Sequence, residues 1–203
     1  NVEMDFGFEA TVKRRPLESG ELHEYKDWFN CYPIAHDGYN KFFDIALEGC
    51  EVHLNTRITD YDVENMTVYA GDQSFKGDIL ISTISPDILF NYQYGELKYV
   101  GREFHKIVLP IESVFPDSVY FVYYPNASEA QTRVVEYKKF TLHQSPSTLL
   151  GVEIPSLRNK LYPTMIRAEV DKAQKYIDNL PSNVYSVGRM GKYRYIDIDD
   201  IIL

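Results

Sequence analysis

The sequence is poor in cysteine and tryptophan, has no excess of basic residues and contains no long apolar run. Its two cysteines, Cys31 and Cys50, lack the paired spacing of a zinc site, and we expect both to be reduced thiols in the core. The formal net charge of −9 excludes nucleic acid as a partner, because a phosphate backbone requires a basic protein face. The sequence shows no signal peptide and no run of the ~20 apolar residues that a membrane span needs, which predicts a soluble cytoplasmic protein.

One nucleotide-binding motif is also missing. No strand is followed by Gly-x-Gly-x-x-Gly, which seats a dinucleotide pyrophosphate on a helix N-terminus. The chain therefore lacks the usual phosphate-binding loop of a dinucleotide site.

Aromatic residues are abundant, with 17 tyrosines and 11 phenylalanines, and they favour sheet surfaces and stacking sites. An extended segment is expected at 52–56. A turn around Gly71 predicts a hairpin between 66–69 and 73–75. The apolar run 78–83 ends in small polar residues, which is typical of a parallel strand buried on both faces.

Further along, alternating polarity predicts an antiparallel sheet, with strands near 97–111, 118–125, 131–142 and 148–154. Helical periodicity predicts helices over 40–47 and 165–180, the first capped by Asp37 or Asn40 and ended by Gly49. The expected buried stripe of that first helix is Phe42, Phe43, Ala46 and Leu47.

The end of the chain carries a run that local propensity explains poorly. Residues 188–199 read Gly-Arg-Met-Gly-Lys-Tyr-Arg-Tyr-Ile-Asp-Ile-Asp, after an extended segment over 184–187. A glycine beside an arginine after a strand allows backbone to approach a cofactor closely, since no Cβ blocks the way. On pattern alone, the alternative interpretation is a polar turn before a short helix starting near Asp199.

Further motifs precede it in the chain. Residues 92–99 read Tyr-Gln-Tyr-Gly-Glu-Leu-Lys-Tyr, residues 132–140 read Thr-Arg-Val-Val-Glu-Tyr-Lys-Lys-Phe, and Tyr-Pro stands at 162–163. Pattern alone would make 132–140 a strand with one charged face. Taken together and in this order, the motifs resemble those of the UDP-galactopyranose mutases.

The resemblance implies an α/β fold, the α+β portion of a two-domain flavoprotein. It would comprise the C-terminal part of a Rossmann-like FAD domain and an antiparallel β-sheet substrate domain. Since the dinucleotide loop is missing, we expect the chain to be the C-terminal portion of a longer flavoprotein, with doubtful activity by itself. The expected parts are 1–32, the end of a helical, mobile-loop region; 33–92, part of the FAD domain; 93–175, the substrate domain; and 176–203, the return to the FAD domain with its flavin motif.

The substrate site that the resemblance implies is a diphosphate clamp. Arg133, Tyr162 and Tyr195 would bind the diphosphate of the substrate. A guanidinium suits that role because its fork matches phosphate oxygens and stays charged in any environment. Glu136, three residues after Arg133, would point to the other face of its strand and is expected to be structural.

The remaining implied site residues concern a closing loop and the cofactor. Arg15, or its neighbour Arg14, would close over the nucleotide sugar, and Tyr25 would stack on the uracil. No metal is expected. The residues expected to bind FAD are Gly188, Arg189, Asp197 and Ile198.

The implied activity is the interconversion of UDP-galactopyranose and UDP-galactofuranose with reduced FAD, through an adduct between flavin N5 and the sugar. The partner would be a UDP-galactose type nucleotide sugar, and a homo-oligomer is left open. Other interpretations remain: an amine-oxidase-like FAD oxidoreductase, a mutase for another UDP-sugar, or a non-catalytic fragment that binds nucleotide sugar.

Overall fold

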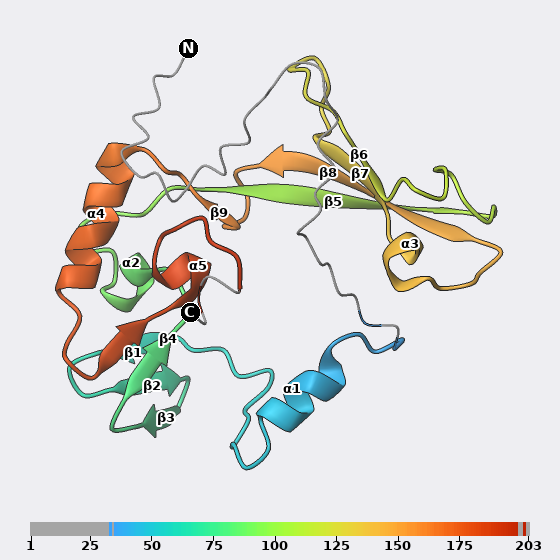
Figure 1. Ribbon diagram of the computed structural model, residues 1–203. Helices are drawn as coiled ribbons and strands as arrows, with labels where there is room; N and C mark the ends of the chain where they lie inside the picture. The colour runs from blue at the N-terminus through green and yellow to red at the C-terminus, as the bar shows by residue number, and fades with distance from the viewer. Residues whose placement is uncertain (1–32, 34, 199–200, 202–203) are drawn as a thin grey trace. The chain divides into compact units, whose positions relative to one another are not determined.

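The computed structural model describes residues 33, 35–198 and 201, which form two compact units (Figure 1). Unit 1 contains Leu54–Gly101 and the described residues from Leu157 onward, and unit 2 contains Arg102–Ser156 and the described residues up to His53. The fold is mixed α/β with antiparallel sheets, as the sequence predicts. Across the residues that are described, the helices are too short or too polar to cross a membrane.

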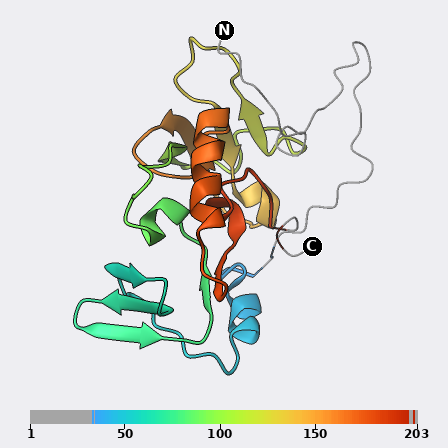
Figure 2. The same cartoon turned by 90° about the vertical axis from the view of Figure 1, so that its left-hand side faces the viewer.

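Unit 1 contains a three-stranded antiparallel meander, visible in Figure 2 in teal and green. Its strands are β1 (Asp60–Asp62), β2 (Thr67–Ala70) and β3 (Gln73–Lys76). The predicted hairpin is confirmed, with Gly71 at φ +62° in the turn between β2 and β3. The strand expected at 52–56 is wrong, because Asn55 takes a φ of +55° that interrupts extended backbone.

A two-stranded parallel sheet joins β4 (Leu80–Ser82) to β10 (Val184–Ser186). The parallel pairing is confirmed, but burial on both faces is wrong, since Ile79 and Ile81 are 58% and 66% exposed. Tyr185 of β10, which pairs with Ile81, is also 51% exposed, so the described residues do not cover this face of the two-stranded sheet.

The core of unit 1 lies around α4 (Arg167–Asp178), which confirms the helix expected over 165–180. This helix packs beside α2 (Pro86–Leu89) (Figures 1 and 2). The fully buried Tyr176 of α4 donates its hydroxyl to the Gly95 carbonyl at 2.9 Å and accepts the Tyr94 amide at 2.8 Å. One aromatic side chain thus ties the helix to the loop before the sheet.

Unit 2 is built on an antiparallel sheet in the order β6-β7-β8-β5. Strand β5 begins in unit 1, where Tyr99 and Val100 pair with β9. Arg133 of β7 lies directly opposite Glu153 of β8 in the register. The strands are β5 (Tyr99–Leu109), β6 (Phe121–Tyr123), β7 (Arg133–Glu136), β8 (Thr148–Ser156) and β9 (Tyr162–Pro163).

All four strands expected in this region are present, but the one expected over 131–142 is too long. After β7 the chain forms the helical turn α3 (Lys138–Thr141), which ends at Leu142 with φ +56°. The Lys138 ammonium donates to the carbonyls of Ser145 and Ser147 at 2.8 and 3.2 Å. The loop after α3 folds back, and these hydrogen bonds satisfy two of its carbonyl groups. They take the place of the ladder hydrogen bonds that a longer β7 would make.

Glu136, the last residue of β7, is a fully buried carboxylate. It accepts the backbone N–H groups of Val114 and Phe115, both at 2.9 Å, and the hydroxyl of Thr148 at 2.6 Å. Lys139 lies 3.7 Å away. The structural role expected for Glu136 is therefore confirmed: it fastens the segment after β5 to the sheet.

The first helix, α1 (Asn40–Ala46), differs from the expectation. Its predicted buried stripe is wrong, because Phe42 and Phe43 are 66% and 56% exposed and no residue of the helix is buried. Neither Asp37 nor Asn40 caps it by a side chain. Amphipathic spacing places apolar residues on one face, but burial needs a surface to pack against, and the described residues supply none. Cys50, expected in the core, is likewise exposed, whereas Gly49 does follow the helix end at φ +82°.

Candidate functional site

The turn after β10 in unit 1 gathers several of the predicted site residues. Gly188, at φ +79°, opens the one-turn helix α5 (Gly188–Gly191). The guanidinium carbon of the next residue, Arg189, lies 5.3 Å from the ring centre of Tyr162 and 4.7 Å from that of Tyr195. The two rings are 5.5 Å apart. We call Arg189, Tyr162, Tyr195 and Asp197 the Arg189 cluster.

Two hydrogen bonds fix the guanidinium of Arg189. Its Nε donates to the carbonyl of Ile196 at 3.0 Å, and Nη2 donates to the Asp197 carboxylate at 3.3 Å. Both partners lie within nine residues of chain, so the motif closes on itself. The short sequence spacing from Arg189 through Tyr195 to Asp197 therefore allows this segment to fold into a closed loop.

The close packing of this turn depends on Gly191. A Cβ there would lie 2.8 Å from Ser186 Oγ and 3.2 Å from the carbonyl oxygen of Ser82. Ser186 in turn donates its hydroxyl to the Gly191 carbonyl at 2.8 Å. The turn therefore sits against the ends of β4 and β10, where a side chain at position 191 would force it away.

Tyr162 reaches the Arg189 cluster from a distant part of the sequence. It lies on β9, which pairs with the start of β5. Two residues on, the Thr164 N–H donates to the hydroxyl of Tyr193 at 3.2 Å, and that hydroxyl donates to the Lys98 carbonyl at 2.5 Å. Burial raises the pKa of Tyr193, so its hydroxyl keeps its proton as a donor. The buried tyrosine thereby couples β9 to the C-terminal motif.

A second arginine site lies on the sheet of unit 2. The buried Glu153 carboxylate of β8 accepts Nε and Nη2 of Arg133 on its Oε1, at 2.9 and 2.5 Å. Its Oε2 accepts Nη1 of Arg102 from β5. Both arginine side chains are 29% exposed, against 6% for Glu153. We call these three residues, which come from three neighbouring strands, the guanidinium row.

Aromatic rings flank the guanidinium of Arg133. Its carbon lies 5.7 Å from the ring centre of Phe121 and 5.8 Å from that of Tyr123, at cation–π distance. Burial by itself lowers the pKa of Arg133, but the hydrogen bond and charge of Glu153 outweigh it and raise the pKa overall. The group is therefore a permanent cation with a fixed orientation.

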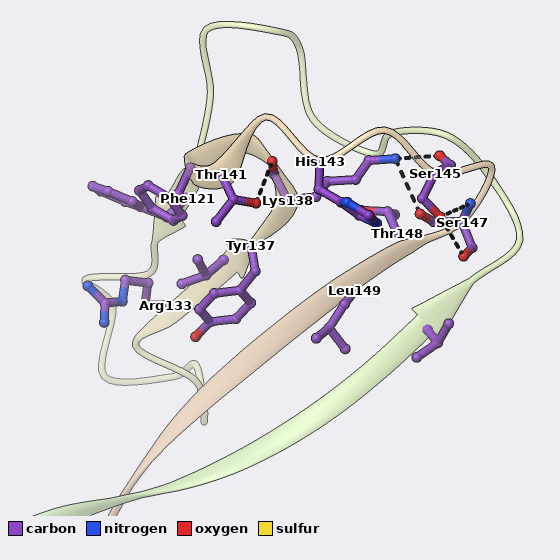
Figure 3. A pocket seen from close by; sticks show the side chains of 13 residues that line it. Phe121, Arg133, Tyr137, Lys138, Thr141, His143, Ser145, Ser147, Thr148 and Leu149 are labelled. Atoms are coloured by element: carbon purple, nitrogen blue, oxygen red, sulfur yellow. Dashed lines mark hydrogen bonds between the residues drawn. The ribbon is translucent and has the colours of Figure 1, made fainter. Parts of the chain in front are cut away.

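Arg133 also lines a cavity of about 660 Å³ in unit 2. Figure 3 shows Arg133, Phe121 and Tyr137 at one end of it, with Ser145 and Ser147 at the other. The lining is mostly apolar, and it includes Val108, Val135, Phe140 and Leu149.

The structure brings together the Arg189 cluster, which joins four of the predicted site residues, while Arg133 lies in the other unit. Gly188 opens α5 beside that cluster, and Ile198 is 77% exposed. Arg15 and Tyr25 lie outside the described residues. Among the side chains that are described, no group of three or more potential metal ligands occurs.

Sequence reasoning missed two members of the guanidinium row, Arg102 and Glu153. The signal for Glu153 was available: it is an acidic residue in the middle of an otherwise apolar strand, Thr148–Ser156. A buried carboxylate in such a strand requires a cationic or hydrogen-bonding partner. Which cation it pairs with depends on the strand order, which local pattern does not give.

Comparison with known proteins identifies this mixed α/β architecture. The sequence profile of the UDP-galactopyranose mutase family matches residues 7–195. The UDP-galactopyranose mutase of Mycoplasma genitalium is 27% identical over 194 residues, which cover 84% of this chain and 45% of the relative. A crystal structure of reduced UDP-galactopyranose mutase has the same fold, with a TM-score of 0.61 at 16% identity, over 78% of this chain and 46% of that one.

The chain therefore belongs to the UDP-galactopyranose mutase family, as the motifs predict. It spans less than half the length of the relative and of the solved structure that it matches.

Proposed function

We propose that the protein containing this chain interconverts UDP-galactopyranose and UDP-galactofuranose, and that this chain supplies residues that hold the substrate diphosphate. The observation that carries the proposal is the Arg189 cluster. Tyr162 and Tyr195, 33 positions apart in the sequence, lie with their rings 5.5 Å from each other and on the same guanidinium. Two phenol hydroxyls so placed can donate hydrogen bonds to the phosphate oxygens of one ligand, while Arg189 holds the two rings in place.

Arg133 would serve as the fixed part of the diphosphate clamp. Its guanidinium is oriented by Glu153 and held on a sheet strand, so it loses little conformational freedom when a ligand binds. The same cation would stabilise the negative charge of the departing UDP, because a preorganised charge costs no reorganisation during the reaction. Since the whole chain carries a net charge of −9, local arginines must supply this attraction.

FAD fits the residues at the start of α5. Gly188 has a positive φ, and a Cβ on it would meet nothing within 4 Å, so the backbone is open to close approach there. We assign Gly188, Arg189, Asp197 and Ile198 to the cofactor. A reduced flavin, when bound, would supply the nucleophile for the exchange of ring forms. The residues of this chain would orient the nucleotide sugar and hold its diphosphate.

The test is an activity assay on the natural full-length protein. With dithionite and UDP-galactofuranose we expect conversion to UDP-galactopyranose, resolved by chromatography, and with oxidised enzyme little or none. Hydrogen peroxide should not form in air, which separates a mutase from an amine-oxidase-like enzyme. Absence of conversion under reducing conditions, in a protein shown to contain flavin, would contradict the proposal.

A further inference from the structure

The helical turn α5 ends in a Schellman motif with an unusual residue at its turning point. Tyr193, the residue after the helix cap Lys192, has a φ of +49°, in the left-handed region. Its N–H donates to the carbonyl of Met190 at 3.2 Å, and the N–H of Arg194 donates to the carbonyl of Arg189 at 3.1 Å. Glycine usually takes this position, because a Cβ makes left-handed backbone costly. A bulky residue keeps this conformation only where its surroundings hold it.

The contacts of the Tyr193 side chain offset this backbone cost. Its ring is 2% exposed and packs edge-to-face on Tyr99, with the ring centres 5.1 Å apart. The hydroxyl donates to the Lys98 carbonyl at 2.5 Å and accepts the N–H of Thr164 at 3.2 Å. The Lys98 carbonyl also accepts that same N–H, at 3.1 Å. One buried hydroxyl therefore lies where the segments next to β5, β9 and α5 meet.

We propose that Tyr193 is a positioning residue for the two tyrosines assigned to the substrate diphosphate. Its hydroxyl holds β9, on which Tyr162 lies two residues before Thr164. Its left-handed backbone turns the chain after α5, so that Tyr195 comes back to the guanidinium of Arg189. The proposal deepens the proposed function and rests on it. Tyr193 itself is buried and would act on the ligand only through the placement of the two rings.

The spacing along the chain supports this role. Each of the two tyrosines lies two residues from one end of the Tyr193–Thr164 hydrogen bond, and their rings are 5.5 Å apart. A group that binds a ligand has to be held within about 0.5 Å of its productive position. A single hydrogen bond this close to both tyrosines can therefore decide how well one ligand engages both hydroxyls.

The experiment measures binding of UDP and of uridine to the natural full-length protein by calorimetry. We expect Tyr193→Phe to weaken UDP binding about tenfold, because the ring still packs while the hydrogen bond between the two segments is lost. Uridine binding should not change, since uridine lacks the diphosphate. Each variant is assayed at equal flavin content and at a temperature at which its melting curve shows it to be folded. Unaltered UDP affinity in Tyr193→Phe would overturn the proposal.

Tyr176→Phe is the matched control. Tyr176 is also fully buried, and its hydroxyl likewise donates to one carbonyl, that of Gly95, and accepts one N–H, that of Tyr94. Deletion of this hydroxyl should cost similar stability and leave UDP binding unchanged, because its hydrogen bonds tie α4 to the loop before β5. If both variants weaken UDP binding equally, the effect follows from lost stability and Tyr193 has no positioning role.

A double-mutant cycle with Tyr162→Phe gives a readout that lost stability alone would not change. A positioning Tyr193 acts partly through the hydroxyl of Tyr162, so its effect should shrink once that hydroxyl is gone. In Tyr162→Phe protein we expect Tyr193→Phe to weaken UDP binding by about threefold or less, in place of tenfold. Fully additive losses would contradict the coupling between the two residues.

The outcomes separate this inference from the proposed function. If Tyr162→Phe weakens UDP binding while Tyr193→Phe does not, the positioning role is wrong and the proposed function stands. If the unsubstituted protein binds no UDP, the proposed function itself fails.

Discussion

The two arginine sites hold equally exposed side chains in different ways. Arg189 and Arg133 are both 29% exposed, but the carboxylate of Asp197 is 49% exposed and that of Glu153 only 6%. Arg189 depends on a carbonyl and an acid of its own loop, whereas Arg133 depends on a buried acid of a neighbouring strand. An exposed ion pair contributes little to stability, and a buried one is costly to break. We therefore expect the ion pair of Arg133 to contribute more to the stability of the protein than the ion pair of Arg189.

The largest expected effect comes from removing the buried acid that supports the sheet. Glu136→Ala should lower the stability of the protein by roughly 3 kcal/mol or more, because it leaves two backbone N–H groups and one hydroxyl without their acceptor and removes the negative charge beside Lys139. Thermal and urea denaturation measure the loss. Glu129→Ala removes an exposed acid and serves as the control, and equal stability of the two variants would contradict the role of Glu136.

Next in size is the loss of the sheet-held arginine. Arg133→Ala should weaken UDP binding roughly thirtyfold or more, since losing one partner of a desolvated charge pair costs about 2–5 kcal/mol. Arg133→Lys should recover only part, because a point charge cannot reproduce the fork. The flavin absorbance spectrum should not change in either variant. Unaltered UDP affinity in Arg133→Ala would remove Arg133 from the site.

The stability of unit 2 should depend on pH through Glu136. Burial tends to raise the pKa of Glu136, but hydrogen bonds from Thr148, Phe115 and Val114 outweigh it and lower the pKa below 4.5. Its contribution to stability is therefore fully present above its unfolded pKa, and is lost as pH falls through the folded value. Melting temperatures of the wild type and Glu136→Gln should differ most near pH 7, and the difference should shrink as the pH falls below the unfolded value and the carboxylate takes up its proton. A gap that stays constant with pH would count against the ionised carboxylate.

The smallest effect is expected at the exposed pair of the Arg189 cluster. Asp197→Asn should lower the free energy of unfolding by less than about 1 kcal/mol, because solvent screens a half-exposed carboxylate. Asp72→Asn, in the exposed β2–β3 turn, is a control of the same chemistry. A loss of 2 kcal/mol or more in urea unfolding would show that this loop is held as firmly as the sheet.

The elements that were predicted correctly are those whose formation depends on residues close together in the sequence. The turn at Gly71, the extended segment that became β10, and the helix that became α4 follow from glycine conformation and from periodicity over a few residues. The residues of the Arg189 cluster were named from the family resemblance, and three of the four lie within the closed loop of 189–197.

What local pattern could not predict is burial and pairing across the fold. The apolar residues of α1 and Ile81 of β4 have the spacing of a core, yet exposure depends on which other segments cover them. The pairing of Arg102 with Glu153 links residues 51 positions apart through the strand order of the sheet. Such contacts depend on the order of the strands in the sheet, and residues that are close in the sequence give no signal of that order.

Gly151 limits how the sequence of this protein can change. It sits on β8 two residues before Glu153, and a Cβ there would collide with the rings of both Phe104 and Tyr137. A side chain at 151 must therefore displace an aromatic ring next to the guanidinium row, unless a smaller residue stands at 104 or 137. We expect relatives with a residue larger than glycine at 151 to carry a smaller residue at 104 or 137.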